Sequence, residues 1–93
     1  MMRKNQRPSP HAIQRFRERT GSEKSDEKIR LKLLALWANA KEVKLKREYR
    51  AIALLNHGLR EARYFRAGGF VLVIENDQIS TVHNGEAGRW ENA

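Results

Sequence analysis

The chain has 93 residues, of which 40% are hydrophobic and 32% charged, as expected for one globular domain rather than a disordered chain. No apolar run approaches the roughly 18 residues that a membrane span requires, and the charged first residues lack the apolar stretch of a secretory signal. The chain has no cysteine. This excludes disulfides, thiolate zinc sites and a cysteine nucleophile, and it is consistent with a reducing cytoplasm.

Basic residues are in large excess and unevenly distributed. Nineteen Lys and Arg against eleven Asp and Glu give a net charge of +8. Residues 1–66 carry +11, whereas residues 67–93 carry −3. Such a charge is typical of a small protein that binds a polyanion, most often nucleic acid. An anionic membrane surface or an acidic protein is an alternative partner, because net charge alone does not identify the partner.

The first third of the chain predicts a basic arm followed by two helices. Residues 1–8 carry Arg3, Lys4 and Arg7 without hydrophobic periodicity, which predicts a flexible arm. Ser9-Pro10 is a helix start, and the helix should run from Pro10 to about Thr20 and stop at Gly21. Ser22 or Ser25 caps a second helix. Its predicted core face is Ile29, Leu33, Leu36, Trp37 and Ala40, widened by Leu31 and Leu34.

Residues 41–58 allow two interpretations. Val43 and Leu45 alternate with lysines, which suggests a strand, whereas the wider apolar spacing fits a helix ending at Gly58. We favour a third helix from about Lys46 to His57.

The last third predicts an antiparallel meander. Its strands are Ala62 to Arg66, a central apolar strand Phe70 to Ile74, and a closing strand Gln78 to His83. Gly68-Gly69 and Asn76-Asp77 are the turns between them. We therefore predict an α+β domain over residues 9–85, with two or three N-terminal helices packed on a C-terminal β-meander, and a tail over residues 86–93.

One polar constellation could carry chemistry. His11, Arg15 and Arg19 recur every four residues and so share a face of the first helix. Cleavage of RNA needs a base for the ribose 2′-hydroxyl, a cation for the phosphorane and an acid for the leaving oxygen. His11, in the first helical turn, is a candidate base, and Arg15 can bind phosphate oxygens through two N–H groups. Thr81 or His83 would face them from the sheet, since period two places Ile79, Thr81 and His83 on one face, and Tyr64 offers a further hydroxyl.

A plainer interpretation of the same residues is a solvated helix face, with Glu18 paired to an arginine. Metal ligation is disfavoured, because the three histidines form no short ligand pair and the acids are scattered. We expect neither a metal nor a cofactor. His57 suits a helix C-terminus, and Trp90 is either a packing anchor or a stacking platform, of which we favour packing.

Two short motifs resemble a known group of proteins. The segment His11-Ala12-x-x-Arg15-Phe16-x-Glu18-Arg19 is similar to the H-A-x-x-R-x-x-E-R helix of small bacterial and phage proteins of the barnase, EndoU, colicin and RelE-like nuclease superfamily. Ile79-Ser80-Thr81-Val82-His83 is similar to their last strand. The resemblance implies metal-independent RNA cleavage by toxin or phage proteins, with His11 and Arg15 acting with Thr81, and with Arg19 and His83 as additions.

Three functions remain open on the sequence. The first is a RelE-like ribonuclease or toxin domain that acts on RNA, with Arg3, Lys4, Arg7 and Arg19 contacting phosphates. The second is a non-enzymatic phage or mobile-element protein that binds nucleic acid or inhibits a nucleoprotein machine. The third is an adaptor for an acidic protein such as an antitoxin.

Overall fold

Ser9 and Gly21 set the two ends of the first helix. In the computed structural model, which describes residues 7–50, 62–85 and 89–92, helix α1 spans Pro10–Thr20. The Ser9 hydroxyl accepts a hydrogen bond from the Ala12 N–H at 3.0 Å. Gly21 adopts φ 65°, the left-handed conformation that ends many helices, and its N–H binds the Arg17 carbonyl. The predicted helix is confirmed at both ends.

Helix α2 spans Asp26–Ala38, and of the two predicted N-cap residues it is Ser25, not Ser22, that caps it. Ile29, Leu33 and Trp37 are buried, as the helical spacing predicts. Leu31 is 57% exposed, so its assignment to the core face was wrong. Two residues along a helix correspond to about 200° of rotation, which turns Leu31 away from both Ile29 and Leu33.

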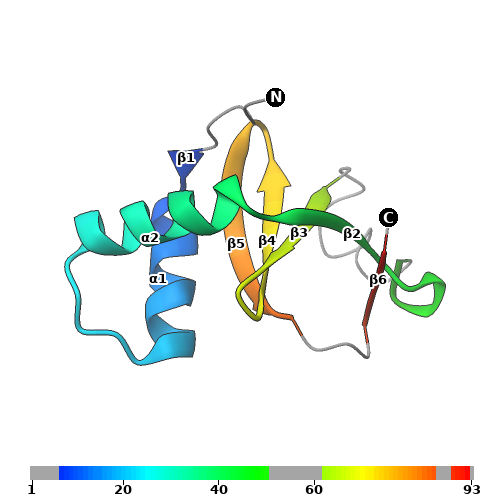
Figure 1. Cartoon of the computed structure of the whole chain (residues 1–93), viewed down its shortest axis with the longest axis horizontal. Coiled ribbons are helices and arrows are strands. Elements are labelled where there is room, and N and C mark those ends of the chain that lie inside the picture. The colour runs from blue at the N-terminus through cyan, green and yellow to red at the C-terminus, as the bar shows by residue number, and fades with distance from the viewer. Residues whose placement is uncertain (1–6, 51–61, 86–88, 93) are drawn as a thin grey trace.

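The strands form one six-stranded sheet in the order β1-β5-β4-β3-β2-β6 (Figure 1). Only β1 and β5 pair in parallel; every other neighbouring pair is antiparallel. The apolar segment predicted as the central strand is β4, which lies inside the sheet. This is the predicted α+β arrangement of helices packed on a β-meander. The strand bounds are β1 Arg7–Pro8, β2 Lys41–Leu45, β3 Arg63–Ala67, β4 Phe70–Glu75, β5 Gln78–Asn84 and β6 Trp90–Asn92.

Both tight hairpins use residues in the left-handed region. Gly68 and Gly69 have φ values of 56° and 83°, and Asn76 and Asp77 have 51° and 59°. Two successive positive φ values are what a two-residue turn requires to match the twist of the flanking strands. The two predicted turns are confirmed, and they fix the register of β4 against its neighbours.

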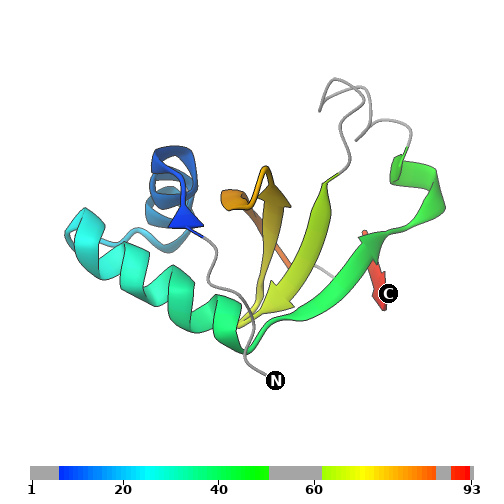
Figure 2. The same ribbon diagram turned by 90° about the horizontal axis from the view of Figure 1, so that it is seen from above.

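The sheet separates two apolar clusters. The larger cluster lies between α1, α2 and one sheet face (Figure 2), and it includes Phe16, Leu33, Trp37, Leu72 and Val82. The smaller cluster lies on the other side, which we call the distal face because it is turned away from α1 and α2. It is formed by Val43, Leu45, Val71 and Trp90, with Tyr49 and Tyr64 packed against them.

The structure decides between the two interpretations of residues 41–58. Residues 41–45 are strand β2, as the alternation of Val43 and Leu45 suggests, and residues 47–50 are helical. The favoured third helix is therefore confirmed over 47–50, and the rest of it, with its predicted end at Gly58, lies outside the described residues.

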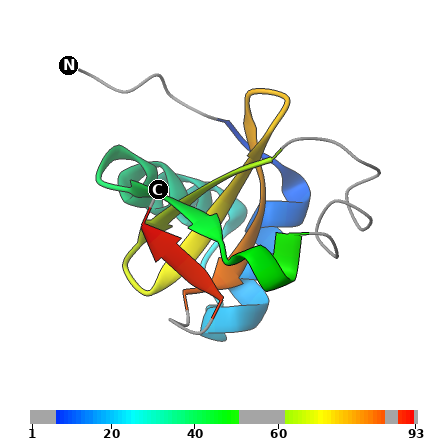
Figure 3. The same cartoon turned by 90° about the vertical axis from the view of Figure 1, so that its right-hand side faces the viewer.

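Both predicted irregular ends differ from the structure. Arg7 and Pro8 form β1, which pairs with Gln78 and Ile79 instead of belonging to a flexible arm. Trp90–Asn92 form β6, which lies beside β2 (Figure 3) instead of continuing a tail. Both strands are too short to show a hydrophobic period, so the local sequence does not predict them. Strand pairing holds β1 and β6 in place, and β6 is also anchored by Trp90, which is 6% exposed.

The Ser9 cap gives a stability prediction. Ser9→Ala removes the α1 cap and also the bond from the Ser9 hydroxyl to the Ser80 carbonyl at 3.0 Å. We expect a loss of about 1–2 kcal/mol in the free energy of unfolding, measured by urea denaturation. Ser25→Ala is the matched control, because that hydroxyl caps an exposed helix end only. Equal losses in the two variants would contradict a role for Ser9 in joining α1 to the sheet.

Candidate functional site

A β-bulge determines which residues of β5 face the distal side. Ile79 pairs with Ile74, but Thr81 pairs with Val73, so Ser80 is an extra residue between them. Ile79 and Val82 therefore face the helices and are fully buried, whereas Thr81 and His83 lie on the distal face. The prediction that Ile79 shares a face with Thr81 and His83 was wrong, because the bulge reverses the alternation at Ser80.

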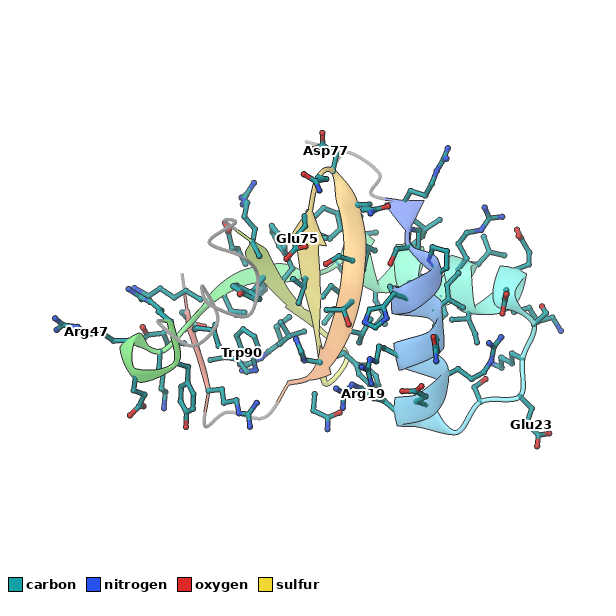
Figure 4. The ribbon with its side chains drawn as sticks, turned by 180° about the vertical axis from the view of Figure 1, so that it is seen from behind. Arg19, Glu23, Arg47, Glu75, Asp77 and Trp90 are labelled. Atoms are coloured by element: carbon teal, nitrogen blue, oxygen red, sulfur yellow. The ribbon has the colours of Figure 1, made fainter. Side chains whose placement is uncertain are left out.

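The predicted basic face of α1 lies along the outer edge of β5. The Arg19 Nε donates to the Val82 carbonyl at 2.9 Å, which places Arg19 between α1 and β5 (Figure 4). On the other side of the helix, Arg17 binds Asp26 of α2. His11, Arg15 and Arg19 therefore line the side of α1 turned away from α2, and we call these three residues the α1 flank.

His11 and Arg15 contact each other on this flank. The Arg15 Nε donates to the His11 Nε2 at 3.4 Å, and the Arg15 Nη1 lies 3.2 Å from a Glu18 carboxylate oxygen. In this contact the Nε2 lone pair of His11 accepts a hydrogen bond. The Glu18 partner of the plainer interpretation is thus present. Both ion-pair partners are about half-exposed, and an exposed pair of this kind contributes little stability and is easily exchanged for another anion.

Ser9 fixes the position of this flank relative to the bulge. Its N–H donates to the Ile79 carbonyl at 2.9 Å, and its hydroxyl donates to the Ser80 carbonyl at 3.0 Å. The first turn of α1, with His11, consequently begins at the level of Ser80, next to Thr81. The structure places the four predicted site residues on two surfaces: His11 and Arg15 lie on the α1 flank, and Thr81 and His83 lie on the distal face. The β5 edge separates these surfaces, so Thr81 and His83 do not face His11 and Arg15 directly as expected.

Two rows of residues cross the distal face. Cα partners place Lys41, Arg66, Val71 and His83 in one row across β2, β3, β4 and β5. The next row contains Val43, Tyr64, Val73 and Thr81. Since neighbouring strands are about 4.8 Å apart, the backbones at Arg66 and His83 are separated by about 10 Å over a fully buried valine.

Arg66 is a candidate that the sequence analysis missed. Its Nε and Nη2 are buried and have no hydrogen-bond partner in the described part of the chain. Arg66 as a whole is half-buried. Burying two of its nitrogens without acceptors is costly, and an anion on this face would supply these acceptors. The period-two alternation of Tyr64 and Arg66 in a strand was the available signal, but the choice of face depends on the pairing of β3 with β4.

Tyr64 and Trp90 complete the distal face. Burial, and secondarily the Glu75 carboxylate, raise the pKa of the Tyr64 hydroxyl, which therefore remains a hydrogen-bond donor at neutral pH. The ring centroids of Tyr64 and Trp90 are 5.0 Å apart, and those of His83 and Trp90 are 6.3 Å apart. Trp90 is thus a packing anchor, as favoured, and not an exposed stacking platform.

The other predicted contacts are less informative. Arg7 is exposed on β1, while Arg3, Lys4 and His57 lie outside the described residues. Among residues 7–50, 62–85 and 89–92, no group of three or more His, Cys, Asp or Glu could hold a metal ion. Within the same residues, no helix is both long and apolar enough to cross a membrane.

One comparison with known proteins identifies a family for this chain. Residues 8–86 match the model of a family described as "Putative RelE superfamily toxin domain". The match includes both motifs that resemble RelE-like proteins, and the chain belongs to this family of toxin domains. Searches of curated proteins and of solved structures found no match.

Proposed function

We propose that this toxin domain is a metal-independent endoribonuclease whose site extends around the β5 edge. The observation that carries the proposal is the Ser9 contact with the bulge, which aligns the α1 flank with the part of β5 that carries Thr81 and His83. A strand of RNA lying along this edge would contact both surfaces. Membership of a toxin family supports a harmful activity of this kind, and the charge of +11 over residues 1–66 favours a polyanionic substrate.

Each chemical role has a candidate. His11 accepts the proton of the ribose 2′-hydroxyl, and the freed oxygen attacks the adjacent phosphorus. Arg15 releases Glu18 and binds the phosphate oxygens, where charge develops. The departing 5′-oxygen takes a proton from His83, and Thr81 donates a hydrogen bond to the phosphate. The products are a 2′,3′-cyclic phosphate and a 5′-hydroxyl. Arg66 is placed to bind a neighbouring phosphate on the distal face.

The direct test is incubation with RNA in the presence of a chelator. We expect fragments ending in a cyclic phosphate, and Arg66→Gln should reduce their yield. Arg63→Gln is the matched control. It removes the same charge from the same strand on the opposite face, where Arg63 is paired with Glu42 at 2.9 Å. Loss of cleavage on chelation, or identical behaviour of the two variants, would contradict the proposed site.

A second candidate function is binding of nucleic acid without cleavage. The exposed α1 flank favours it, because its cations are available for phosphates whether or not His11 and His83 act in catalysis. RNA bound but recovered intact would support this candidate. An acidic antitoxin protein is a further proposed partner, since it would neutralise the same basic surface.

Salt dependence tests the electrostatic part of either function. Each phosphate neutralised on single-stranded RNA releases about 0.7 counterion, so several contacts give a log–log slope of several units. We expect RNA affinity, measured by fluorescence anisotropy, to fall steeply between about 50 and 200 mM salt. A flat titration would exclude the α1 flank as a phosphate-binding surface.

A further inference from the structure

A second group of cations lies at the end of the molecule opposite to α1. It consists of Lys44, Lys46, Arg47, Arg50 and Arg89, which we call the β6-end cluster. The segments that carry it are held together, because the Lys46 N–H donates to the Arg89 carbonyl at 2.9 Å and the Arg50 Nε to the Leu45 carbonyl at 2.9 Å. Strand β2, the helical residues 47–50 and β6 adjoin one another there (Figure 3).

These cations are only partly neutralised. Glu91 is shared between Lys44 at 3.8 Å and Arg50 at 3.4 Å. Within the described residues, no ion pair involves Lys46, Arg47 or Arg89. With Glu48 and Glu91 counted, the cluster retains a charge of +3. The Arg89 guanidinium lies 5.8 Å from the centre of the Tyr49 ring, so an aromatic group adjoins the cations.

We propose that the β6-end cluster is a second phosphate-binding surface for the flanks of a single-stranded RNA that crosses the distal face. This inference rests on the proposed function and adds the length and path of the substrate. Figure 4 shows Arg47 at one end of the molecule, Glu23 at the other, and Trp90 of the distal face between Arg47 and Arg19. A strand bound at the β5 edge therefore reaches the cluster by continuing over the distal face.

The dimensions set the expected length. The longest extent of the fold, 36 Å, is an upper limit for the distance between the α1 flank and the cluster, and successive phosphates along one strand of a duplex are about 3.4 Å apart along the helix axis. RNA of about 11 nucleotides is therefore long enough to contact both surfaces, whereas RNA of about four nucleotides can contact only one of them. Two contact regions joined by one flexible ligand strengthen binding through effective concentration.

The test compares two triple variants and two RNA lengths. Lys46→Gln, Arg47→Gln and Arg89→Gln together remove three charges from the cluster. Lys24→Gln, Lys28→Gln and Lys32→Gln together are the control, with the same charge change in and just before α2. For RNA of about 12 nucleotides, the cluster variant should lower the salt slope by about 2, because three phosphate contacts each release about 0.7 counterion. Cleavage of a four-nucleotide RNA should not change, because an RNA of this length is cleaved at the β5 edge without reaching the cluster.

The outcomes separate this inference from the proposed function. Cleavage by the wild type, together with equal losses of affinity in the two triple variants or no dependence on RNA length, would overturn the cluster's role and leave the ribonuclease intact. Length-dependent binding that is lost only in the cluster variant, with no cleavage by the wild type, would support the surface and reject the ribonuclease. Failure of the wild type to bind RNA at low salt would overturn both.

Discussion

Replacing His11 by alanine should lower the rate of RNA cleavage by roughly 10²–10⁴-fold, the usual effect of losing acid–base assistance. The physical reason is its accepting Nε2, which lies on α1 beside the guanidinium that would bind the phosphate. His11 is exposed, so the fold should be retained, as a thermal melt would show. His83→Ala should have a comparable effect if His83 donates the proton to the leaving oxygen.

Two controls make this expectation specific. Gln14→Ala changes another exposed polar residue of α1, whose amide binds Glu18 at 3.2 Å, and it should leave the rate nearly unchanged. Arg15→Lys should be damaging, because a single ammonium cannot reproduce the two parallel bonds of a guanidinium to phosphate. Full cleavage by both His11→Ala and Arg15→Ala would reject the mechanism and favour binding without catalysis.

Replacing Trp37 by alanine should destabilise the fold by about 3–5 kcal/mol, as truncation of a buried aromatic side chain usually does. Trp37 is 4% exposed and joins α2 to the sheet. Its ring meets Phe65 of β3 edge-on, with centroids 4.6 Å apart. An alanine would leave a cavity between the helices and the sheet.

Urea denaturation measures this loss, and Leu31→Ala supplies the comparison within the same helix. Leu31 is 57% exposed, and its truncation should change stability by about 0.5 kcal/mol or less. If the Trp37→Ala variant were as stable as the Leu31→Ala variant, the assignment of Trp37 to the core between α2 and β3 would be wrong.

Much of the candidate site could be predicted because its signals are local. The spacing of His11, Arg15 and Arg19 places them on one side of a helix whatever the helix packs against. Thr81 and His83 are correctly paired on one strand face, because period two holds on either side of a bulge. Arg66 could not be assigned in this way, since its orientation depends on pairing with Val71 across the hairpin.

The sequence alone determined the elements whose ends and turns are set by neighbouring residues. Ser9, Pro10 and Gly21 bound α1, and the Gly68-Gly69 and Asn76-Asp77 pairs set the hairpins, because caps and tight turns act within about four residues. Tertiary structure alone decided the Ser80 bulge, the pairing of β6 with β2 and the two rows on the distal face. These features depend on strand partners distant in sequence, and their stabilisation comes from pairing and burial that no local pattern records.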